Sequence, residues 1–353
     1  MSPLDVSNAA EPLRWGIIAT GRIAGVFARG LTQSKLGVLQ AVGSRSVESA
    51  QRFGAAHRVE PSHIHASYAD LLADKSVDAV YVATPHPGHL EVVLAALAAG
   101  KHVLCEKPMG MNLREVEAMQ AAAAAANRTL MEAWMYRCHP QTAKIVELVR
   151  DGAIGTLRHV QAAFSFRAEF DPSGRMWGKA LGGGGILDVG GYPLSYARLL
   201  AGVAMGQAFA EPEEFHAVGH VHPISGVDEH TTALLRFGGD ITAEISCGVG
   251  VHQDNRVRIY GTGGWIYVPS PYVITRAMES SRLELHREGT DEVEVITITP
   301  DRGLYAYEAD VFAAAVRAGE REVSACLWAD TYGNVAAQTR WRHVLSVTYD
   351  ADA

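Results

Sequence analysis

The sequence has few cysteines, and no short spacing pairs them. Four occur in 353 residues, scattered without a C-x-x-C motif: Cys105, Cys138, Cys247 and Cys326. A disulfide framework or a cysteine-based zinc cluster needs closely spaced cysteines, so the sequence argues against both. We expect reduced thiols, as in a cytoplasmic protein.

The chain also lacks a basic surplus and a long apolar run. Its net charge of −8 argues against nucleic acid as the main partner, because phosphate binding needs a clustered basic surface. No apolar run approaches the roughly 18 residues of a membrane-spanning helix. The start, MSPLDVSNAAEPLRW, has neither a basic region before an apolar one nor twin arginines. We therefore expect no membrane partner, no export and a cytoplasmic location.

Histidine, by contrast, is frequent, with 15 residues. The motifs HIH (63–65) and HPGH (86–89) invite a metal hypothesis. No acidic or cysteine ligand lies at a matching spacing, however, and catalytic zinc takes three protein ligands in one place. We expect no metal.

The length of the chain predicts two domains, and the hydrophobic pattern divides them near residue 132. Residues 1–132 alternate between apolar strands and helical stretches, the signature of a doubly wound parallel sheet in an α/β domain. The strands are expected at 13–19, 38–44, 77–83 and 102–105, and a helix at 112–126 with a capping box from Asn112 and Glu115.

Residues 133–353 follow a different pattern. Two-residue alternation and glycine pairs predict a large, mostly antiparallel open sheet in an α+β domain that binds substrate. The predicted strands are 231–237, 241–246, 257–260, 265–268, 283–286 and 293–298. Late helices near 305–318 and 329–343 end the chain and are candidates for packing back on the first domain.

The first strand-to-helix turn, RWGIIATGRIAG, lies where dinucleotide folds carry G-x-G-x-x-G/A. Ala19, Gly21 and Ala24 take the three positions, so the first glycine is replaced. Gly21 keeps the position where the backbone approaches a pyrophosphate, and Arg22 and Ile23 open a helix with free N–H groups. A plain tight turn is the alternative explanation.

The end of the second strand indicates which dinucleotide. An NAD site places an acid there for the ribose 2′-hydroxyl, but this chain has Ser44, Arg45 and Ser46, with no carboxylate before Glu48. A guanidinium and hydroxyls suit a 2′-phosphate, so we favour NADP(H), with NAD(H) possible. Alternatively, Arg45 is a solvated loop residue.

With these turns, the motifs ATPHPGH and LCEKPMGMN make the chain resemble the Gfo/Idh/MocA oxidoreductases. The likeness is strongest to the branch with dihydrodiol dehydrogenase, glucose–fructose oxidoreductase and NADP-dependent aldose dehydrogenases, through LMEAWMYRCHPQ and GGGGILDVGGYPLS. The resemblance implies a Rossmann domain, and a C-terminal open sheet through which such proteins often dimerise. It places Lys107 beside the nicotinamide and assigns catalysis to Asp188 and Tyr192.

The chemistry of these three residues can be argued separately. Hydride transfer from an alcohol requires its hydroxyl to lose a proton, and a tyrosine pKa near 10 is too high for a base at neutral pH. An ammonium such as that of Lys107 would lower it. Asp188 lies four residues before Tyr192, so both share a helix face, and Gly190 and Gly191 are expected to leave room for substrate.

Each catalytic candidate also has a structural interpretation. Asp188 could cap the helix, Tyr192 could be a core ring, and Lys107 could pair with Glu106. The residues expected to flank the cofactor are Thr84, Pro85, His86, His89 and Glu106, with helix capping as the alternative for the two histidines. The candidate substrate contacts are Arg137, His139, Arg167 and Trp177, with interdomain packing or plain surface as the alternative.

The sequence therefore predicts an NADP(H)-dependent oxidoreductase that acts on a sugar or polyol and forms a homodimer or homotetramer through the C-terminal sheet. Two alternatives stay open. One is a keto-sugar reductase of the anhydrofructose type, which would use the same residues in reverse. The other is a regulator that binds dinucleotide without catalysis.

Overall fold

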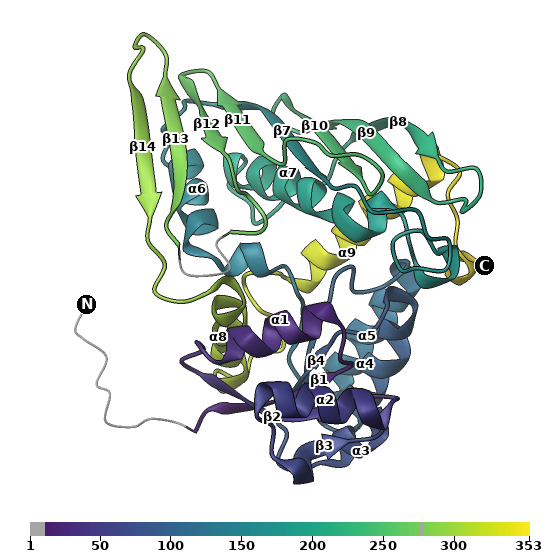
Figure 1. Ribbon diagram of the computed structural model, residues 1–353. Helices are drawn as coiled ribbons and strands as arrows, with labels where there is room; N and C mark the ends of the chain where they lie inside the picture. Colours follow the sequence, from purple (N-terminus) through teal and green to yellow (C-terminus); the bar gives the residue numbers. More distant parts are fainter. Residues whose placement is uncertain (1–10, 275–278) are drawn as a thin grey trace.

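A computed structural model describes residues 11–274 and 279–353 of the chain and contains two sheets (Figure 1). Most of the leading segment used in the export argument lies outside these residues. Within them, no helix is long and apolar enough to cross a membrane.

The first sheet has six parallel strands in the order β3-β2-β1-β4-β5-β6, a doubly wound Rossmann sheet as predicted. The strands are β1 (Leu13–Ile18), β2 (Gly37–Gly43), β3 (Ile64–His65), β4 (Ala79–Val82), β5 (His102–Cys105) and β6 (Leu130–Glu132). Its helices are α1 (Arg22–Leu31), α2 (Val47–His57), α3 (Tyr68–Ala73), α4 (His89–Ala98) and α5 (Leu113–Ala126). The proposed boundary after residue 132 coincides with the end of β6.

Local signals explain several helix ends in this half. Gly100, just beyond α4, has a φ of +76°, a conformation that glycine adopts without strain. At α5, the Asn112 side chain accepts a hydrogen bond from the Glu115 N–H at 3.1 Å. The expected capping box is only half formed, because the Glu115 carboxylate accepts from the Met111 N–H at 2.8 Å instead of that of Asn112.

The second sheet has eight strands in the order β14-β13-β12-β11-β7-β10-β9-β8. Only β7 and β10 pair in parallel, so the sheet is mostly antiparallel, as predicted. The strands are β7 (Leu157–Ser165), β8 (Glu214–Val221), β9 (Asp228–Phe237), β10 (Ile241–Gly248), β11 (Val257–Gly261), β12 (Gly264–Val268), β13 (Ser281–Arg287) and β14 (Val293–Ile298). Helices α6 (Pro140–Arg150), α7 (Gly191–Ala204) and α9 (Trp328–Val344) lie on one side of it (Figure 1).

The last two helices connect the halves of the molecule. Helix α8 (Leu304–Arg317) packs on α1, and its Phe312 ring lies 5.1 Å from that of Trp15 in β1. The Asp310 carboxylate accepts hydrogen bonds from the backbone N–H groups of Lys35 and Leu36 just before β2. At the start of α9, Trp328 donates its indole N–H to the carbonyl of Leu130 in β6 at 2.9 Å. The C-terminal helices thus complete the first domain.

A π-helical turn, Ile186–Gly190, leads directly into α7. Such turns bond each carbonyl to the N–H five residues on. Five residues beyond Asp188 is Pro193, which has no N–H. No π-type hydrogen bond can therefore occupy the Asp188 carbonyl.

Candidate active site

The partner of that carbonyl is Lys107, which follows β5 at the carboxyl edge of the first sheet. Its ammonium donates to the Asp188 carbonyl oxygen at 2.5 Å and lies 3.6 Å from the carboxylate Oδ1 of the same residue. It also lies 5.2 Å from the centroid of the Tyr192 ring. The structure thus brings together the three residues named as catalytic from sequence.

A second cation, missed from sequence, completes this group. Arg175 donates from Nη1 to Asp188 Oδ1 at 2.9 Å, and its side chain remains 40% exposed. Burial alone would raise the pKa of Asp188, but the charges of Lys107 and Arg175 outweigh it and lower the pKa to about 2. Arg175 lies in an irregular segment without a motif, so no sequence signal marked it.

Tyr192 is buried in a cluster of aromatic rings, and the Trp134 ring lies edge-on to it at 4.7 Å. Its hydroxyl donates to the sulfur of Met135 at 3.4 Å, a weak acceptor. Burial, reinforced by the nearby Tyr305 and Glu106, raises the pKa of Tyr192 well above its ordinary value. The expected lowering by Lys107 is therefore wrong for the protein alone, because loss of solvent outweighs the single ammonium.

Glu106 does not hold the Lys107 side chain, which was one alternative. Its carboxylate accepts hydrogen bonds from the Tyr81 hydroxyl and from the backbone N–H of Lys107. Burial raises the pKa of Glu106. The residue thus fixes the backbone from which Lys107 projects and leaves the ammonium to Asp188.

The two glycines between Asp188 and Tyr192 do not make room for substrate, contrary to expectation. A Cβ on Gly190 would lie 2.9 Å from the sulfur of Cys247 in β10. A Cβ on Gly191 would lie 2.7 Å from the Trp134 ring and 2.8 Å from the Gln338 amide. Glycine is required at both positions because the segment from Asp188 to Tyr192 packs tightly on the second sheet and on the side chains of Trp134 and Gln338.

The glycine-rich segment before Asp188 is anchored from both halves of the molecule. His86, after β4, donates from Nδ1 to the Gly182 carbonyl at 3.1 Å. Its ring is neutral, because burial lowers the pKa of His86 well below its ordinary value. From the second sheet, Asp228 accepts the Ile186 N–H at 2.7 Å. His86 therefore connects a predicted cofactor loop to the catalytic segment.

The neighbouring His89 ties together the two loops that follow β4 and β5. Its Nε2 lies 3.0 Å from the Thr84 carbonyl and its Nδ1 3.0 Å from that of Pro108. Burial lowers the pKa of His89, so the neutral ring donates to one carbonyl at a time. The ring is fully buried, with both nitrogens turned to backbone carbonyls.

Three of the candidate substrate contacts pack inside the protein. Arg137 donates to Ser195 and forms an ion pair with Asp330 at 3.0 Å. His139 caps α6, and burial lowers its pKa to about 4. The Trp177 ring is buried against Phe170 and His222. These contacts favour the packing alternative, because all three side chains are buried among protein neighbours, although His139 Nε2 and Trp177 Nε1 have no hydrogen-bond partner among the described residues.

The fourth candidate, Arg167, lies on the surface. Its backbone pairs with Gly250 in an isolated bridge, and its side chain is exposed. The surface alternative fits this position.

One step of the argument against a metal was wrong. Asp74 lies 2.7 Å from His63 Nδ1 and 3.0 Å from His65 Nε2, so an acidic group does reach the HIH motif. It comes from the end of α3, which the sequence spacing alone does not bring near.

The family of the chain follows from two matches to family models. The NAD-binding Rossmann model of the oxidoreductase family GFO/IDH/MocA matches residues 13–134, and the GFO/IDH/MocA C-terminal domain model matches residues 142–267. The chain belongs to the Gfo/Idh/MocA family. It is thus an NAD(P)-binding oxidoreductase.

Relatives within the Gfo/Idh/MocA family include trans-1,2-dihydrobenzene-1,2-diol dehydrogenases. The one from Danio rerio is 33% identical over 97% of this chain and 99% of its own length. The one from Mus musculus is 36% identical over 71% of this chain and 73% of its own. The likeness to the dihydrodiol branch, stated from sequence, is confirmed.

Solved structures with the same fold include an aldose–aldose oxidoreductase and a 3-ketoreductase. An aldose–aldose oxidoreductase from Caulobacter crescentus has a TM-score of 0.83 at 25% identity, over 95% of this chain and 98% of that one. A 3-ketoreductase from Actinomadura kijaniata, solved with NADP and TDP-benzene, has a TM-score of 0.82 at 27% identity, over 94% and 98%.

The turn after β1 fits the dinucleotide that Gfo/Idh/MocA proteins bind. A Cβ on Gly21 would meet no atom within 4 Å, and no side chain caps the helix that Arg22 and Ile23 open. Open space in front of uncapped N–H groups suits a pyrophosphate. Ala19 holds a φ of +75°, the left-handed conformation usually left to glycine. Ala19 therefore adopts the backbone conformation that the first glycine of the motif would have at this position.

The loop after β2 fits the adenosine end of such a cofactor. Ser44 is buried and accepts the Ser46 N–H at 3.3 Å, whereas Arg45 is exposed. The nearest acid, Glu48, accepts the Ser46 hydroxyl at 2.8 Å. The guanidinium is thus left facing solvent, while the one nearby carboxylate is held by a serine.

Proposed function

We propose that the protein is an NADP(H)-dependent oxidoreductase acting on a hydroxyl or carbonyl of a sugar, polyol or dihydrodiol, with Tyr192 as the acid/base. The observation that carries this proposal is the meeting of Lys107, Asp188 and Tyr192 at the carboxyl edge of the Rossmann sheet. A regulator that only binds dinucleotide has no need of an ammonium held beside a carboxylate and a tyrosine.

Each of the three residues has a distinct task. The Lys107 ammonium, held by the Asp188 carbonyl, is placed to hydrogen-bond the substrate oxygen and to stabilise charge on it. The ionised Asp188 carboxylate orients both Lys107 and Arg175. Tyr192 exchanges a proton with the substrate oxygen, and a bound nicotinamide would supply the hydride chemistry that accompanies this transfer.

The protonation state of Tyr192 bears on its role as an acid. A pKa raised by burial keeps the phenol protonated at neutral pH, and a protonated phenol is a proton donor. In reduction, Tyr192 gives its proton to the carbonyl oxygen, and Lys107 stabilises the resulting phenolate. The protonated phenol is the form from which reduction of a keto-sugar, the second candidate function, starts.

The preference for NADP(H) over NAD(H) rests on the loop after β2. Arg45 offers an exposed guanidinium, and Ser44 and Ser46 add hydroxyls. The solved 3-ketoreductase similar to this chain was crystallised with NADP, whereas a levoglucosan dehydrogenase with the same fold was solved with NADH. Without an acid aimed at the ribose, the 2′-phosphate form is favoured here.

A substrate screen tests the proposal. Purified protein would be assayed with aldoses, inositols, keto-sugars and trans-dihydrodiols, each with NADP(H) and NAD(H), by nicotinamide absorbance. We expect turnover of at least one sugar or diol class with NADP(H), and loss of that turnover in Tyr192→Phe. Stoichiometric dinucleotide binding without turnover of any class would instead support the regulator.

We also propose that the protein self-associates through the open face of the second sheet. Helices cover one side of this sheet only (Figure 1). Apolar side chains stand exposed on its strands, among them Val218 in β8 and Leu234 in β9. Light scattering after size exclusion should report a dimer or tetramer that Leu234→Asp weakens, and a wild-type monomer would contradict this.

A further inference from the structure

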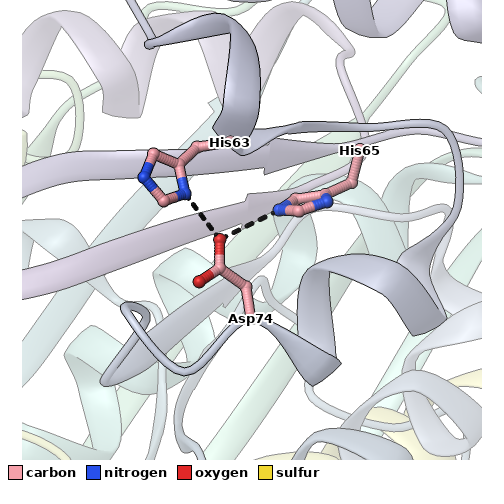
Figure 2. Close-up of side chains that lie close together, drawn as sticks. All are labelled: His63, His65 and Asp74. Carbon is pink, nitrogen blue, oxygen red and sulfur yellow. Dashed lines mark hydrogen bonds and ion pairs between the residues drawn. The ribbon is translucent and has the colours of Figure 1, made fainter.

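Away from the catalytic group, three potential metal ligands meet at the edge of the Rossmann sheet (Figure 2). His63 ends the short 3₁₀ helix before β3, His65 lies in β3, and Asp74 follows α3. Asp74 Oδ2 lies 2.7 Å from Nδ1 of His63 and 3.0 Å from Nε2 of His65. Two imidazoles and a carboxylate therefore point at one spot.

The carboxylate is fixed in orientation by a serine behind it. Ser76 donates to Asp74 Oδ1 from its backbone N–H at 2.8 Å and from its hydroxyl at 2.6 Å. This leaves Oδ2 for the histidines. Partial burial opposes ionisation, but the hydrogen bonds from Ser76, His63 and His65 outweigh it and hold the pKa of Asp74 well below its usual range. Asp74 is thus a preoriented, ionised ligand of the kind that metal sites use.

We propose that His63, His65 and Asp74 bind one divalent transition-metal ion, with zinc as the reference ion. Two imidazole nitrogens and one carboxylate oxygen are borderline ligands that suit zinc and its neighbours, whereas magnesium and calcium prefer oxygen alone. The three side chains remain 25%, 16% and 10% exposed, so an ion and its water can enter from solvent.

The three ligand atoms lie within 4.8 Å of one another, and they must shift to take up the geometry of a bound ion. Zinc bonds of about 2.0–2.1 Å at tetrahedral angles separate ligand atoms by about 3.3 Å, a few tenths of an ångström more than the present contacts. The ring protons that now face Asp74 Oδ2 move to the opposite nitrogen of each neutral imidazole, so no net charge is lost.

The ion would clamp the edge strand and take no part in hydride transfer. It joins β3 to the end of α3, and β3 is the outermost strand of the sheet, separated from β5 by three others. The backbone also connects this edge to the loop after β2, because the His65 carbonyl accepts the Ser44 N–H at 3.2 Å. The expected effect is stabilisation of the Rossmann half, independent of turnover.

The test is a zinc titration of the untagged, chelator-treated full-length protein in competition with a chromogenic chelator. We expect one zinc per chain, and a loss of affinity of at least about 100-fold in His63→Ala/His65→Ala and in Asp74→Asn. His216→Gln is the matched control, because His216 is also a histidine beside a carboxylate, 3.8 Å from Glu214. Absence of stoichiometric binding, or equal affinity in all variants, overturns the proposal.

Two measurements on the wild-type protein test zinc binding even where a variant fails to fold. Zinc should raise the thermal midpoint while magnesium leaves it unchanged. Cobalt, substituted for zinc, should give the visible absorption of a tetrahedral site with nitrogen and oxygen ligands. A wild-type protein with neither response has no such site, whatever the variants do.

Discussion

The replacement Tyr192→Phe separates catalysis from packing more cleanly than any other change in the site. It removes one hydroxyl and keeps the ring. Phenylalanine retains the ring neighbours of Tyr192, including Trp134 at 4.7 Å and Phe164 at 5.1 Å. Only the hydrogen bond to the Met135 sulfur at 3.4 Å is lost.

The magnitudes follow from these contacts. General acid–base catalysis contributes about 10²- to 10⁴-fold, so kcat should fall by that factor, or about 3–5 kcal/mol in activation free energy. A buried hydroxyl that bonds only to sulfur contributes less than an ordinary hydrogen bond, so the free energy of unfolding should change by less than about 1 kcal/mol. The dissociation constant for NADPH should stay nearly the same, because the hydroxyl is expected to contact substrate rather than cofactor.

The assay compares kcat at saturating substrate, NADPH binding by fluorescence, and thermal unfolding. Tyr272→Phe is the control, because its ring lies 5.5 Å from that of Tyr192 and its buried hydroxyl has no hydrogen-bond partner in the described part of the chain. An unchanged kcat in Tyr192→Phe refutes the acid/base role. A similar fall in both variants would point to disturbed packing instead.

Three further predictions concern other parts of the Rossmann half. Arg45→Ala should raise the KM for NADPH at least about tenfold and leave that for NADH nearly unchanged; equal effects would contradict the 2′-phosphate assignment. Ala19→Gly should increase the free energy of unfolding by about 0.5–1 kcal/mol in urea titrations, because relief of the positive φ exceeds the entropy cost of glycine, and a less stable variant would refute this. Burial raises the pKa of Glu132 from 4.5 to about 7, so the folded state keeps a proton that the unfolded chain releases. The contribution of Glu132 to the free energy of unfolding is therefore fully present below pH 4.5. It is lost as the pH rises to about 7, by up to about 3 kcal/mol, and Glu132→Gln should make the free energy of unfolding less dependent on pH in this range.

Much of the Rossmann half could be predicted because its strands are continuous apolar runs between clear turn signals. The predicted strand at 102–105 and helix at 112–126 agree with β5 and α5 to within a residue. Strands β3 and β6 were missed because two and three residues are too few to show a period. In the second sheet, β7 and β8 were missed because LRHVQAAFS and EFHAVGHV carry histidine, glutamine and glycine among their apolar residues.

The site could be predicted where residues follow a strand or share a helix, and not where a loop delivers them. Lys107, Asp188 and Tyr192 were named from motifs. Arg175 was not, because its position depends on how an irregular loop folds back over Asp188. The raised pKa of Tyr192 likewise comes from the whole set of rings around it, which no local pattern encodes.

The packing of α8 on the first domain bears on how the chain folds as it is made. The ring of Trp15 in β1 packs against the ring of Phe312 in α8. The turn before β2 donates backbone hydrogen bonds to the carboxylate of Asp310, also in α8. The packing of β1 and of the turn before β2 therefore depends on residues of α8, which are synthesised much later. A chain stopped before α8 should leave the face of α1 that packs on α8 exposed and remain prone to aggregation, so the Rossmann half reaches its final form only after α8 has been synthesised.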